Sequence, residues 1–477
     1  MTTRKTKNAA TIELSTIQQI SLHERHGKAR DLFTIWFGAN IMLLTVVTGA
    51  LAVTVFGLPF FHALVALIAG NLIGGVFMAL HSAQGPQLGV PQMVQTRGQF
   101  GSYGSLLVVL LVVVMYLGFF ASNLVLGGQA LHGLYAPVTT NQGILMVGVL
   151  GVVATVFGYR LTHAYTRVMS YLSGAVLLLA YIWTLFVHGL PADFLLKNQA
   201  TVPGVLGTIS IAALWQLAYA PYVSDYSRYM PADTGARAAF WASYWGCCLG
   251  SILPMILGVV IGLSVTQGDV VAGLIEMTGS IGVFVVAVFS FGIAATNAMN
   301  LYCGTLSALT VGQTLVPKWS PRAVSRLLMA GMLFAISLTL ALLGQHDFMV
   351  NYTNFILLLL YVLVPWTAIN LVDYYLVAHG TYNVASFFRR DGGIYGYVNW
   401  TAVNCYILGI LVQIPFMSTA LYTGPVAKAM NGADISWLVG LTVVSPIYYF
   451  AYRRSGHQRQ LACAAANASL VNQGGVR

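Results

Sequence analysis

Long apolar runs separated by short polar segments dominate the chain from residue 32 onward. A transmembrane helix needs about 20 mostly apolar residues to cross the hydrocarbon core of a bilayer. Each such run must be helical, because lipid offers no hydrogen-bond partner to backbone N–H and C=O groups. The pattern predicts an all-α polytopic membrane protein of about twelve spans, at 32–57, 61–81, 105–132, 143–160, 164–188, 204–223, 238–265, 279–311, 325–344, 351–376, 400–420 and 435–452.

The composition agrees with burial in lipid. Only 7% of the residues are charged while 58% are apolar, against roughly 25% charged residues in an ordinary soluble domain. The chain has five cysteines, and they lie mostly inside apolar runs without the CxxC spacing of a metal or redox site. We interpret them as small packing residues.

The basic residues define an orientation for the predicted spans. If both termini lie on one side, all of the 22 Lys and Arg residues except Lys197 and Lys428 fall on that side. Cytoplasmic loops carry such an excess of basic residues. We therefore expect cytoplasmic tails at 1–31 and 453–477 in the cytoplasmic (inner) membrane, with no cleaved signal peptide. The net charge of +10 then reflects topology and not nucleic-acid binding.

Three spans contain polar or helix-breaking residues near their middle. Span 1 has the sequence Phe37-Gly38-Ala39-Asn40-Ile41, and span 6 has Trp215-Gln216 shortly before Pro221. Span 8 has two amides and a threonine between Gly292 and Asn300. Interrupted helices in transporters form substrate sites, because unwound backbone is tolerated in a membrane only where it lines a cavity. We expect an interruption in each of the three.

Spans 1 and 6 lie five helices apart and carry their breaks at similar depths. This spacing predicts two five-helix repeats over 32–188 and 204–376, followed by helices 11 and 12 over 400–452. An inverted repeat of this kind is typical of secondary transporters, although hydropathy alone does not establish the inversion.

The candidate site chemistry is neutral. No carboxylate lies at the predicted middle of a span, which argues against a pump or a buried proton relay. The amides Asn40, Asn123, Gln216, Asn297 and Asn300 offer donors and acceptors suited to lactam or amidine edges. A small neutral heterocycle fits such a site better than an amino acid or a sugar acid does.

Other classes of membrane protein find less support. The sequence has no HExxH or GxSxG motif and no acidic pair at depth, so a membrane-embedded enzyme is the weaker alternative. It has no charge rings or repeated carbonyl motif of a channel. It also lacks the GxxxxGK[ST] loop of an ATP-driven pump.

Four ordered motifs resemble the nucleobase–cation symporter family, which includes cytosine permeases and hydantoin transporters. They are Gly85-Pro86 through Pro91–Arg97 with Phe100-Gly101, Ala220–Tyr229, Thr296–Tyr302, and Asp373–Val377 with Gly393–Tyr395 and Asn399-Trp400. The resemblance covers about residues 30–420. It implies a five-plus-five inverted repeat with interrupted helices 1 and 6, two C-terminal helices, and alternating-access uptake of nucleobases or related heterocycles coupled to a cation.

The resemblance also implies a site for the substrate ring between aromatic side chains of helices 3 and 6. Alignment of the motifs gives Phe119 as the helix 3 aromatic, where a tryptophan is common, and Asn123 one turn later. In helix 6 the second stacking residue is Trp215 or Gln216. We favour Trp215 as the ring partner and Gln216 as a hydrogen-bonding group, with Asn297, Asn300 and Asn40 completing the substrate site.

For the coupling ion, the resemblance implies carbonyls of the interrupted helix 1 and of helix 8. The matching residues are Gly38, Ile41, Gly292 and Ala295, with a hydroxyl from Thr296. Ala295 replaces the serine or threonine of Na⁺-coupled members, so both Na⁺ and H⁺ stay open as the coupling cation. The sequence also leaves open the oligomeric state and the heterocycle, including purines, cytosine, uracil, allantoin, hydantoins and vitamin precursors.

Overall fold

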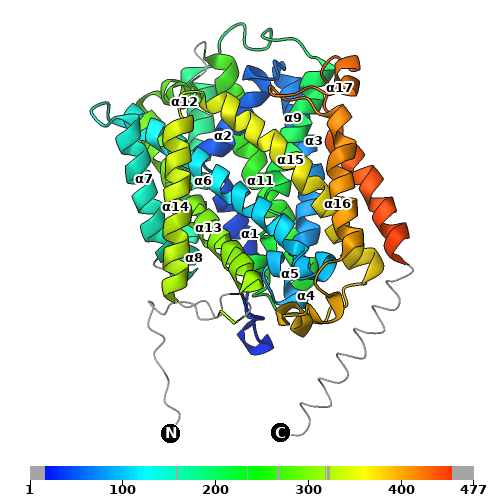
Figure 1. Cartoon of the computed structure of the whole chain (residues 1–477). Helices are drawn as coiled ribbons and strands as arrows, with labels where there is room; N and C mark the ends of the chain where they lie inside the picture. The colour runs from blue at the N-terminus through cyan, green and yellow to red at the C-terminus, as the bar shows by residue number, and fades with distance from the viewer. Residues whose placement is uncertain are drawn as a thin grey trace, which may run out of the picture.

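The computed structural model describes residues 17–156, 159–233, 235–265, 269–316, 318–319 and 323–453, without the side chains of 153–167, 295 and 323. Its helices run nearly side by side through the thickness of the molecule (Figure 1). They are α1 (Ala29–Asn40), α2 (Leu43–Thr54), α3 (Phe60–Ser82), α4 (Gly85–Leu88), α5 (Gln92–Phe100), α6 (Ser105–Leu134), α7 (Thr140–Val156), α8 (Tyr159–Ile182), α9 (Val202–Leu217), α10 (Val223–Ser227), α11 (Gly235–Ser264), α12 (Val270–Thr278), α13 (Gly282–Leu315), α14 (Ala323–Gly344), α15 (Phe348–Leu371), α16 (Trp400–Gln413) and α17 (Pro425–Ala429). A further helix covers 436–453.

Several of these helices are long and apolar enough to cross a membrane. Within the described ranges seven segments pass by length and composition, or eight when the bent pair α1 and α2 counts as one span. Three shorter apolar helices, at Thr140–Val152, Val202–Leu217 and Trp400–Phe416, coincide with the predicted spans 4, 6 and 11. The expectation of an all-α polytopic membrane protein is confirmed.

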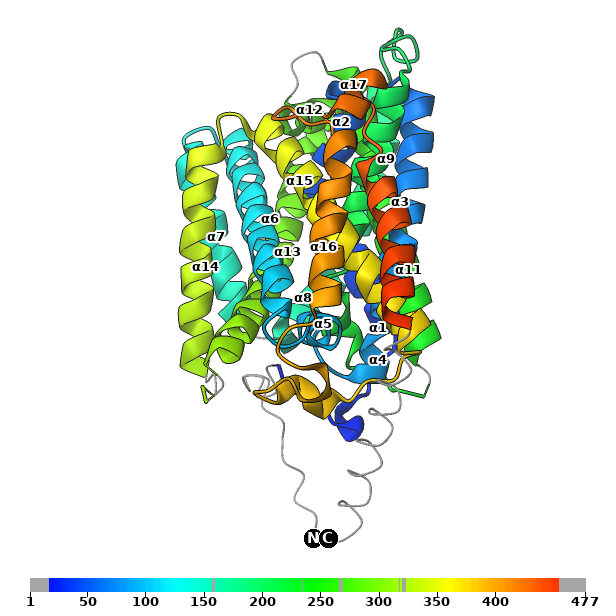
Figure 2. The ribbon, with the colours of Figure 1, turned by 45° about the vertical axis from the view of Figure 1, so that its right-hand side comes forward.

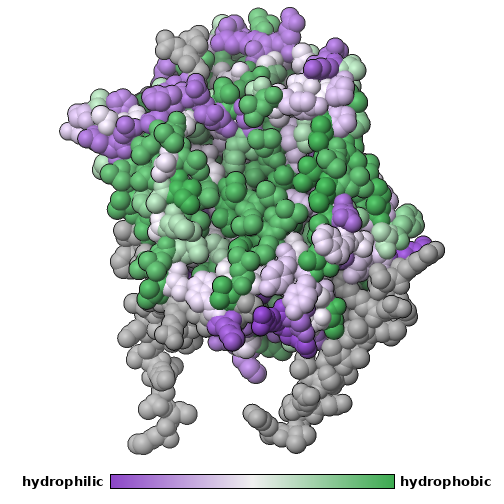
Figure 3. Space-filling model, viewed as in Figure 1, coloured by the Kyte–Doolittle hydropathy of each residue, from purple (hydrophilic) through white to green (hydrophobic). Residues whose placement is uncertain are grey.

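The visible face of the molecule carries an apolar belt. Figure 3 shows hydrophobic side chains over the middle of the visible face and hydrophilic ones gathered at its two ends. Large apolar side chains are exposed, among them Leu328 on α14 at 70% and Phe186 at 81%. A surface of this kind is stable only against lipid, so the belt marks where the bilayer lies.

Close backbone contacts hold the centre of the bundle together. A Cβ atom on Gly258 of α11 would lie 1.9 Å from the carbonyl oxygen of Val46 in α2. On the facing helix, a Cβ on Gly49 would lie 2.0 Å from the carbonyl oxygen of Met255. Small residues let transmembrane helices approach to this distance, so glycine on both helices fixes α2 against α11.

Span 1 is broken as the sequence predicts. Helices α1 and α2 meet at 60° across Ile41 and Met42, and both residues have extended or irregular backbone. In span 6, α9 ends at Leu217, and turns over Ala218–Tyr222 lead into α10. Pro221 cannot donate a backbone hydrogen bond, which prevents α9 from continuing through this segment.

The expected interruption of span 8 is wrong. Helix α13 runs without a break from Gly282 to Leu315. Thr296 and the side-chain oxygen of Asn297 need no unwound backbone, because they find partners on neighbouring helices. The hydroxyl of Thr296 donates to the carbonyl oxygen of Ala39 at 3.0 Å, and Asn297 accepts from Asn123 of α6. Polar side chains satisfied across helices leave a transmembrane helix intact.

The remaining helices flank this centre. α7 and α14 lie together at one side of the molecule, and α16 lies beside the helix over 436–453 at the other (Figure 1). The short helices α4 and α5 follow α3 at one end of the bundle, whereas α12 and α17 lie at the opposite end (Figures 1 and 2).

Candidate functional site

The break in span 1 holds a fully engaged amide. The side-chain oxygen of Asn40 accepts hydrogen bonds from the indole nitrogen of Trp215 at 2.7 Å, the hydroxyl of Tyr219 at 2.7 Å and the hydroxyl of Ser251 at 2.8 Å. Its amide nitrogen donates to the carbonyl oxygen of Trp36 at 2.7 Å. Asn40 is completely buried. A buried polar group must be paired in this way, and Asn40 thereby ties α1 to the end of α9 and to α11.

A narrow cavity, with only about 10 Å³ open to a water-sized sphere, lies beside this amide. It is bounded by the break in span 1, by the break in span 6, and by α6 and α13. Its lining consists of Met42, Phe119, Asn123, Trp215, Ala218, Tyr219, Tyr222, Thr296 and Asn300. A mostly apolar, aromatic lining with a few polar groups is the usual composition of a small-molecule site.

Two of the predicted site residues, Phe119 and Trp215, face each other across this cavity. Their ring centroids are 6.3 Å apart and the ring planes are at 86°. The other edge of Phe119 meets Phe355 of α15 with a centroid distance of 5.2 Å. Edge-to-face rings at this distance are in direct contact. A flat molecule can therefore stack between them only after one ring turns and the pair separates.

The amides Asn123 and Asn297 form a buried pair behind the rings. The amide nitrogen of Asn123 donates to the side-chain oxygen of Asn297 at 3.0 Å. Within the described part of the chain, the oxygen of Asn123 and the amide nitrogen of Asn297 have no hydrogen-bond partner. Asn123 lines the cavity and Asn297 does not, so the pair leaves one acceptor at the cavity wall and one donor behind it.

Gln216 points elsewhere. Its amide nitrogen donates to the side-chain oxygen of Asn71 on α3 at 2.8 Å and to the hydroxyl of Ser251 on α11 at 3.1 Å. It does not belong to the cavity lining among the residues described. Consecutive helical residues point about 100° apart, so Trp215 and Gln216 cannot both face the cavity. The structure does not bring Gln216 to Phe119.

Tyr219 and Tyr222 are cavity residues that the sequence reasoning missed. Their rings pack on each other with a centroid distance of 5.7 Å, and Tyr219 also packs edge-on against Trp215 at 6.3 Å. The spacing of four residues between Trp215 and Tyr219 was a usable signal. Residues four apart share a helix face, and Tyr219 lies just where α9 gives way to turns.

Of the residues predicted for an ion, Ile41, Gly292 and Thr296 lie together. A Cβ atom on Gly292 would be 2.8 Å from the carbonyl oxygen of Ile41. Thr296 donates to the carbonyl oxygens of Ala39 and of Gly292, at 3.0 and 3.2 Å. Carbonyl and hydroxyl oxygens of the broken helix and of α13 therefore converge.

The other two predicted ion ligands differ in their placement. Gly38 lies against α8, where an added Cβ would be 1.8 Å from the hydroxyl of Ser170. The carbonyl oxygen of Gly38 accepts from the backbone N–H of Ile41 at 3.3 Å. The side chain of Ala295 lies outside the described residues. Within those residues, no group of three His, Cys, Asp or Glu side chains could hold a metal ion.

The sequence motifs meet at the end of the bundle that holds α4 and α5. The backbone N–H of Gln92 donates to the carboxylate of Asp225 at 2.9 Å, which joins the segment after span 2 to the segment after the span 6 break. The side chain of Gln99 donates to the hydroxyl of Tyr382 at 2.9 Å, and Tyr382 in turn donates to the carboxylate of Asp373. Motifs far apart in sequence thus form one polar network.

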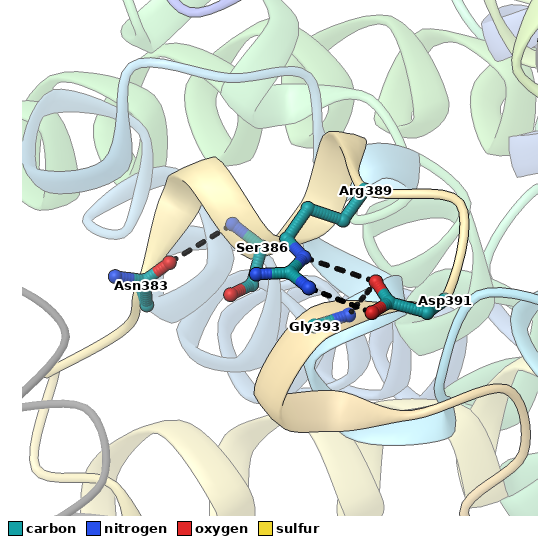
Figure 4. Close-up of polar contacts among 5 residues, drawn as sticks. All are labelled: Asn383, Ser386, Arg389, Asp391 and Gly393. Carbon is teal, nitrogen blue, oxygen red and sulfur yellow. Dashed lines mark hydrogen bonds and ion pairs between the residues drawn. The ribbon is translucent and has the colours of Figure 1, made fainter.

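The last motif closes a loop next to this network. The guanidinium of Arg389 donates hydrogen bonds to both carboxylate oxygens of Asp391, at 3.0 and 2.7 Å. Asp391 also accepts from the backbone N–H of Gly393 (Figure 4). The hydrogen bond from Arg389 is the main cause that lowers the pKa of Asp391 to about 2. Asn383 caps the preceding turn through the backbone N–H of Ser386 (Figure 4).

Comparison with known proteins identifies the family. A profile described as permease for cytosine/purines, uracil, thiamine, allantoin matches residues 19–440. YxlA of Bacillus subtilis (strain 168), whose name describes a purine-cytosine permease, is 41% identical over 94% of this chain and 99% of its own length. The purine-cytosine permease fcyB of Emericella nidulans is 24% identical over 88% of this chain and 84% of its own.

Solved structures agree on the fold. The nucleobase-cation-symport-1 family transporter Mhp1, in a closed conformation with bromovinylhydantoin bound, superposes with a TM-score of 0.72 at 18% identity, covering 94% of this chain and 99% of its own. The resemblance given by the four sequence motifs is confirmed by the profile match and by YxlA. This chain belongs to the family of permeases for cytosine and purines, uracil, thiamine and allantoin, and is a nucleobase-type membrane transporter and not an enzyme.

Proposed function

We propose that the protein is a secondary transporter that imports a purine or cytosine together with a cation. The substrate lies in the cavity between Phe119 and Trp215, and its polar edge meets the amides of Asn123 and Asn300, with Asn297 behind Asn123. The names of YxlA and fcyB support this substrate class over the other compounds in the family description.

The observation that carries the proposal is the half-satisfied amide pair beside two aromatic rings. The free oxygen of Asn123 complements a ring N–H, and the amide of Asn300, which also lines the cavity, offers a donor to a ring acceptor. Leaving such groups unpaired in a buried site costs about 1–3 kcal/mol each. A nucleobase edge that pairs with both therefore gains free energy that an apolar ring of the same size does not.

Gln216 and Asn40 have a different role in this proposal. Both position the site, because Asn40 holds the indole of Trp215 and Gln216 holds the end of α9 against α3 and α11. Stacking then requires the rings of Phe119 and Trp215 to separate, which couples substrate binding to movement of the span 6 break.

The transport cycle follows from two inverted repeats, which we place at 32–188 and 204–376, with 400–452 as added helices. Exchange of the repeats would relate spans 1 and 2 to spans 6 and 7. The packing supports this, since α3 of span 2 packs on α9 of span 6, and α11 of span 7 packs on α1 and α2 of span 1. We expect spans 1, 2, 6 and 7 to rock as a unit against spans 3, 4, 8 and 9.

We further propose twelve spans with both tails, 1–31 and 453–477, in the cytoplasm. The helix over 436–453 supplies the last span. Under this orientation α4, α5 and the Arg389 loop lie on the cytoplasmic side, where positively charged residues concentrate.

The coupling cation, Na⁺ in the first instance, would bind between the span 1 break and α13. The absence of a side chain at Gly292 leaves the carbonyl oxygen of Ile41 open beside it, and the hydroxyl of Thr296 lies within reach. Oxygen ligands of this kind suit a hard cation. Gly38, which lies against α8, and Ala295 would contribute main-chain carbonyls only.

Thermal unfolding of the purified protein across a panel of heterocycles tests the function. The panel holds adenine, hypoxanthine, cytosine, uracil, allantoin, a hydantoin, thiamine and pyridoxine, each in Na⁺ and in choline at equal ionic strength. A ligand at 100 times its Kd stabilises the native state by about 2.7 kcal/mol. We expect purines or cytosine to raise the unfolding temperature, with a larger increase in Na⁺.

Two outcomes would change the proposal. Stabilisation by a purine that is equal in Na⁺ and choline would remove Na⁺ and leave H⁺ as the coupling ion. Stabilisation by allantoin, thiamine or another ring alone would replace the substrate while keeping the family. Uptake of the same labelled compound into cells expressing the protein, and its loss in Trp215→Ala but not in Trp400→Ala, ties binding to transport. Trp400 is a matched control because it is 67% exposed at the start of α16.

A further inference from the structure

A second hollow lies on the outside of the bundle, between the first turns of α1 and α11. It is an open groove of about 620 Å³, lined by Ala29, Arg30, Phe33, Arg237, Ala238, Trp241, Ala242 and Trp245. Alanines form the floor of the groove, and their short side chains leave the space above it open. The helices themselves are in close contact, since a Cβ on Gly246 of α11 would be 2.8 Å from the carbonyl oxygen of Phe33. The groove is therefore a surface feature and not a gap in the bundle.

On both walls of the groove an arginine is followed along the helix by aromatic residues. On α11, Arg237 is followed at four-residue intervals by Trp241 and Trp245. Residues four apart share one face of a helix, and eight residues advance about 12 Å along its axis. On α1, Arg30 is likewise followed by Phe33, one turn deeper. Each wall places a cation at the polar end and an aromatic ring toward the apolar belt.

These side chains are available to a ligand from the membrane. Trp241 is 47% and Trp245 is 43% exposed, and both arginines are exposed. Neither guanidinium forms an ion pair with any other residue that the structure describes. The nearest carboxylates in sequence, Asp31 and Asp233, do not line the groove. The groove therefore has two positive charges without an internal counterion.

We propose that this groove binds an anionic phospholipid of the leaflet that faces the first turns of α1 and α11. The phosphate lies between Arg30 and Arg237, and one acyl chain runs over the alanine floor between Phe33 and the two tryptophans. Basic pockets between transmembrane helices bind anionic headgroups in this way, and tryptophan favours the boundary between headgroup and hydrocarbon. In the proposed orientation this is the cytoplasmic leaflet.

Charge complementarity selects an anionic lipid over a zwitterionic one. Phosphatidylglycerol brings a net negative charge to two guanidiniums, whereas phosphatidylcholine also brings its own cation into the same place. A soluble phosphate ester would meet the arginines but leave Trp241, Trp245 and Phe33 uncovered. Because α1 carries the span 1 break and α11 carries Ser251, which bonds to Asn40, a lipid across both helices covers the outer face of the pair that holds the site.

Native mass spectrometry of the full-length protein in neutral detergent tests the proposal, with phosphatidylglycerol and phosphatidylcholine of the same chain length added in turn. We expect tighter retention of phosphatidylglycerol by the natural chain. Each arginine near the headgroup should contribute about fivefold to its affinity. The double variant R30Q/R237Q is therefore expected to weaken phosphatidylglycerol binding at least tenfold, while R30K/R237K keeps most of it.

The matched control is K318Q/R390Q, which removes the same net charge from two exposed residues outside the groove. It should change phosphatidylglycerol binding less than twofold. Equal losses in both double variants would mean diffuse attraction to a basic surface and would overturn the groove. So would equal retention of the two lipids by the natural chain.

Two further measurements distinguish binding of the whole phospholipid from binding of its phosphate headgroup alone. Ala238→Phe fills the groove without removing a charge, and it is expected to expel phosphatidylglycerol as well. If Ala238→Phe retains the lipid, the acyl chain does not lie in the groove. Glycerol phosphate should neither bind nor compete at millimolar concentration, and binding comparable to that of the lipid would replace the phospholipid with a soluble anion.

Discussion

Two buried amide clusters of this protein differ in one respect. At the span 1 break, the side-chain oxygen of Asn40 accepts from three donors and its nitrogen has its own acceptor. Between α6 and α13, Asn123 and Asn297 share one hydrogen bond and keep an unpaired acceptor and donor. Both clusters are buried, and both lie beside the same aromatic residues.

The difference separates two roles for the same functional group. An amide whose donors and acceptor are all paired within the protein has no group free to bind a ligand. Its hydrogen bonds stabilise the packing of the helices that they join. An amide pair with open groups retains a cost that a substrate can relieve. Asn40 should therefore act on stability, and Asn123 on affinity.

The largest effect is expected from Asn40→Ala. It leaves the indole N–H of Trp215 and the hydroxyls of Tyr219 and Ser251 without their shared acceptor. At about 1–3 kcal/mol for each buried unsatisfied group, the protein should lose roughly 3 kcal/mol or more of stability. Thermal unfolding of the purified protein without substrate measures this.

Asn141→Ala is the control for that change, because Asn141 is exposed on α7 and bonds only to Gln345 among the residues described. It should unfold at nearly the natural temperature. If Asn40→Ala is as stable as Asn141→Ala but binds substrate poorly, Asn40 is a ligand contact and the contrast between the two clusters fails.

Gly292→Ala comes next. The added methyl group would lie 2.8 Å from the carbonyl oxygen of Ile41, so this carbonyl or α13 has to shift. Overpacking of this kind costs about 1–3 kcal/mol. We expect the Na⁺-dependent part of substrate stabilisation to fall at least fivefold, as measured by unfolding temperature in Na⁺ and in choline.

Gly331→Ala provides the comparison, since nothing lies within 4 Å of a Cβ at that position on α14. It should leave both stability and Na⁺ dependence unchanged. An unaltered Na⁺ response in Gly292→Ala would move the cation away from the contact between the span 1 break and α13.

Trp215→Ala removes a stacking surface that is worth on the order of 1 kcal/mol or more, or at least about fivefold in substrate Kd. Trp215→Phe keeps a flat ring but loses the donor to Asn40. It should therefore lower stability more than affinity. Isothermal titration of both variants separates the two contributions, and equal affinity in all three proteins would remove Trp215 from the binding site.

Asn123→Ala should weaken substrate binding by about 0.5–1.5 kcal/mol, the net value of one hydrogen bond, with much less loss of stability than Asn40→Ala. The double variant N123A/N297A removes the open acceptor and donor together. It should be at least as stable as Asn123→Ala and bind no better. A larger loss of stability than in Asn40→Ala would reverse the proposed roles of the two clusters.

The breaks in spans 1 and 6 could be predicted from sequence because Gly38, Asn40 and Pro221 are poor residues for a continuous membrane helix. The same reasoning failed for span 8. Polar residues signal that partners are needed, but not whether backbone or neighbouring side chains supply them. In α13 the partners are the carbonyl oxygen of Ala39 and the side chain of Asn123, both brought from distant segments by packing.

The direction in which side chains point was the second feature of the site that the sequence did not predict. The motif alignment favoured both Trp215 and Gln216 as substrate contacts, yet the helical rotation between neighbours directs them to different surroundings. The rotation of α9 about its axis, which its packing on α3 fixes, decides which one meets Phe119. Pairing with Asn71 and Ser251 depends on α3 and α11, and no local pattern near residue 216 indicates those helices.

The smallest effect is expected at the exposed pair of Arg389 and Asp391, although three hydrogen bonds converge on the Asp391 carboxylate (Figure 4). Water competes for those groups, so surface ion pairs contribute little. The pKa of Asp391 is lowered to about 2, so any stabilisation is complete above its unfolded pKa near 4 and is lost only as pH falls toward 2. Asp391→Asn should therefore unfold slightly below the natural temperature, by the same small amount throughout pH 5–9. A pH-dependent loss in that range would mean that the loop bears on the polar network of α5, and that burial alone does not decide which hydrogen bonds stabilise this transporter.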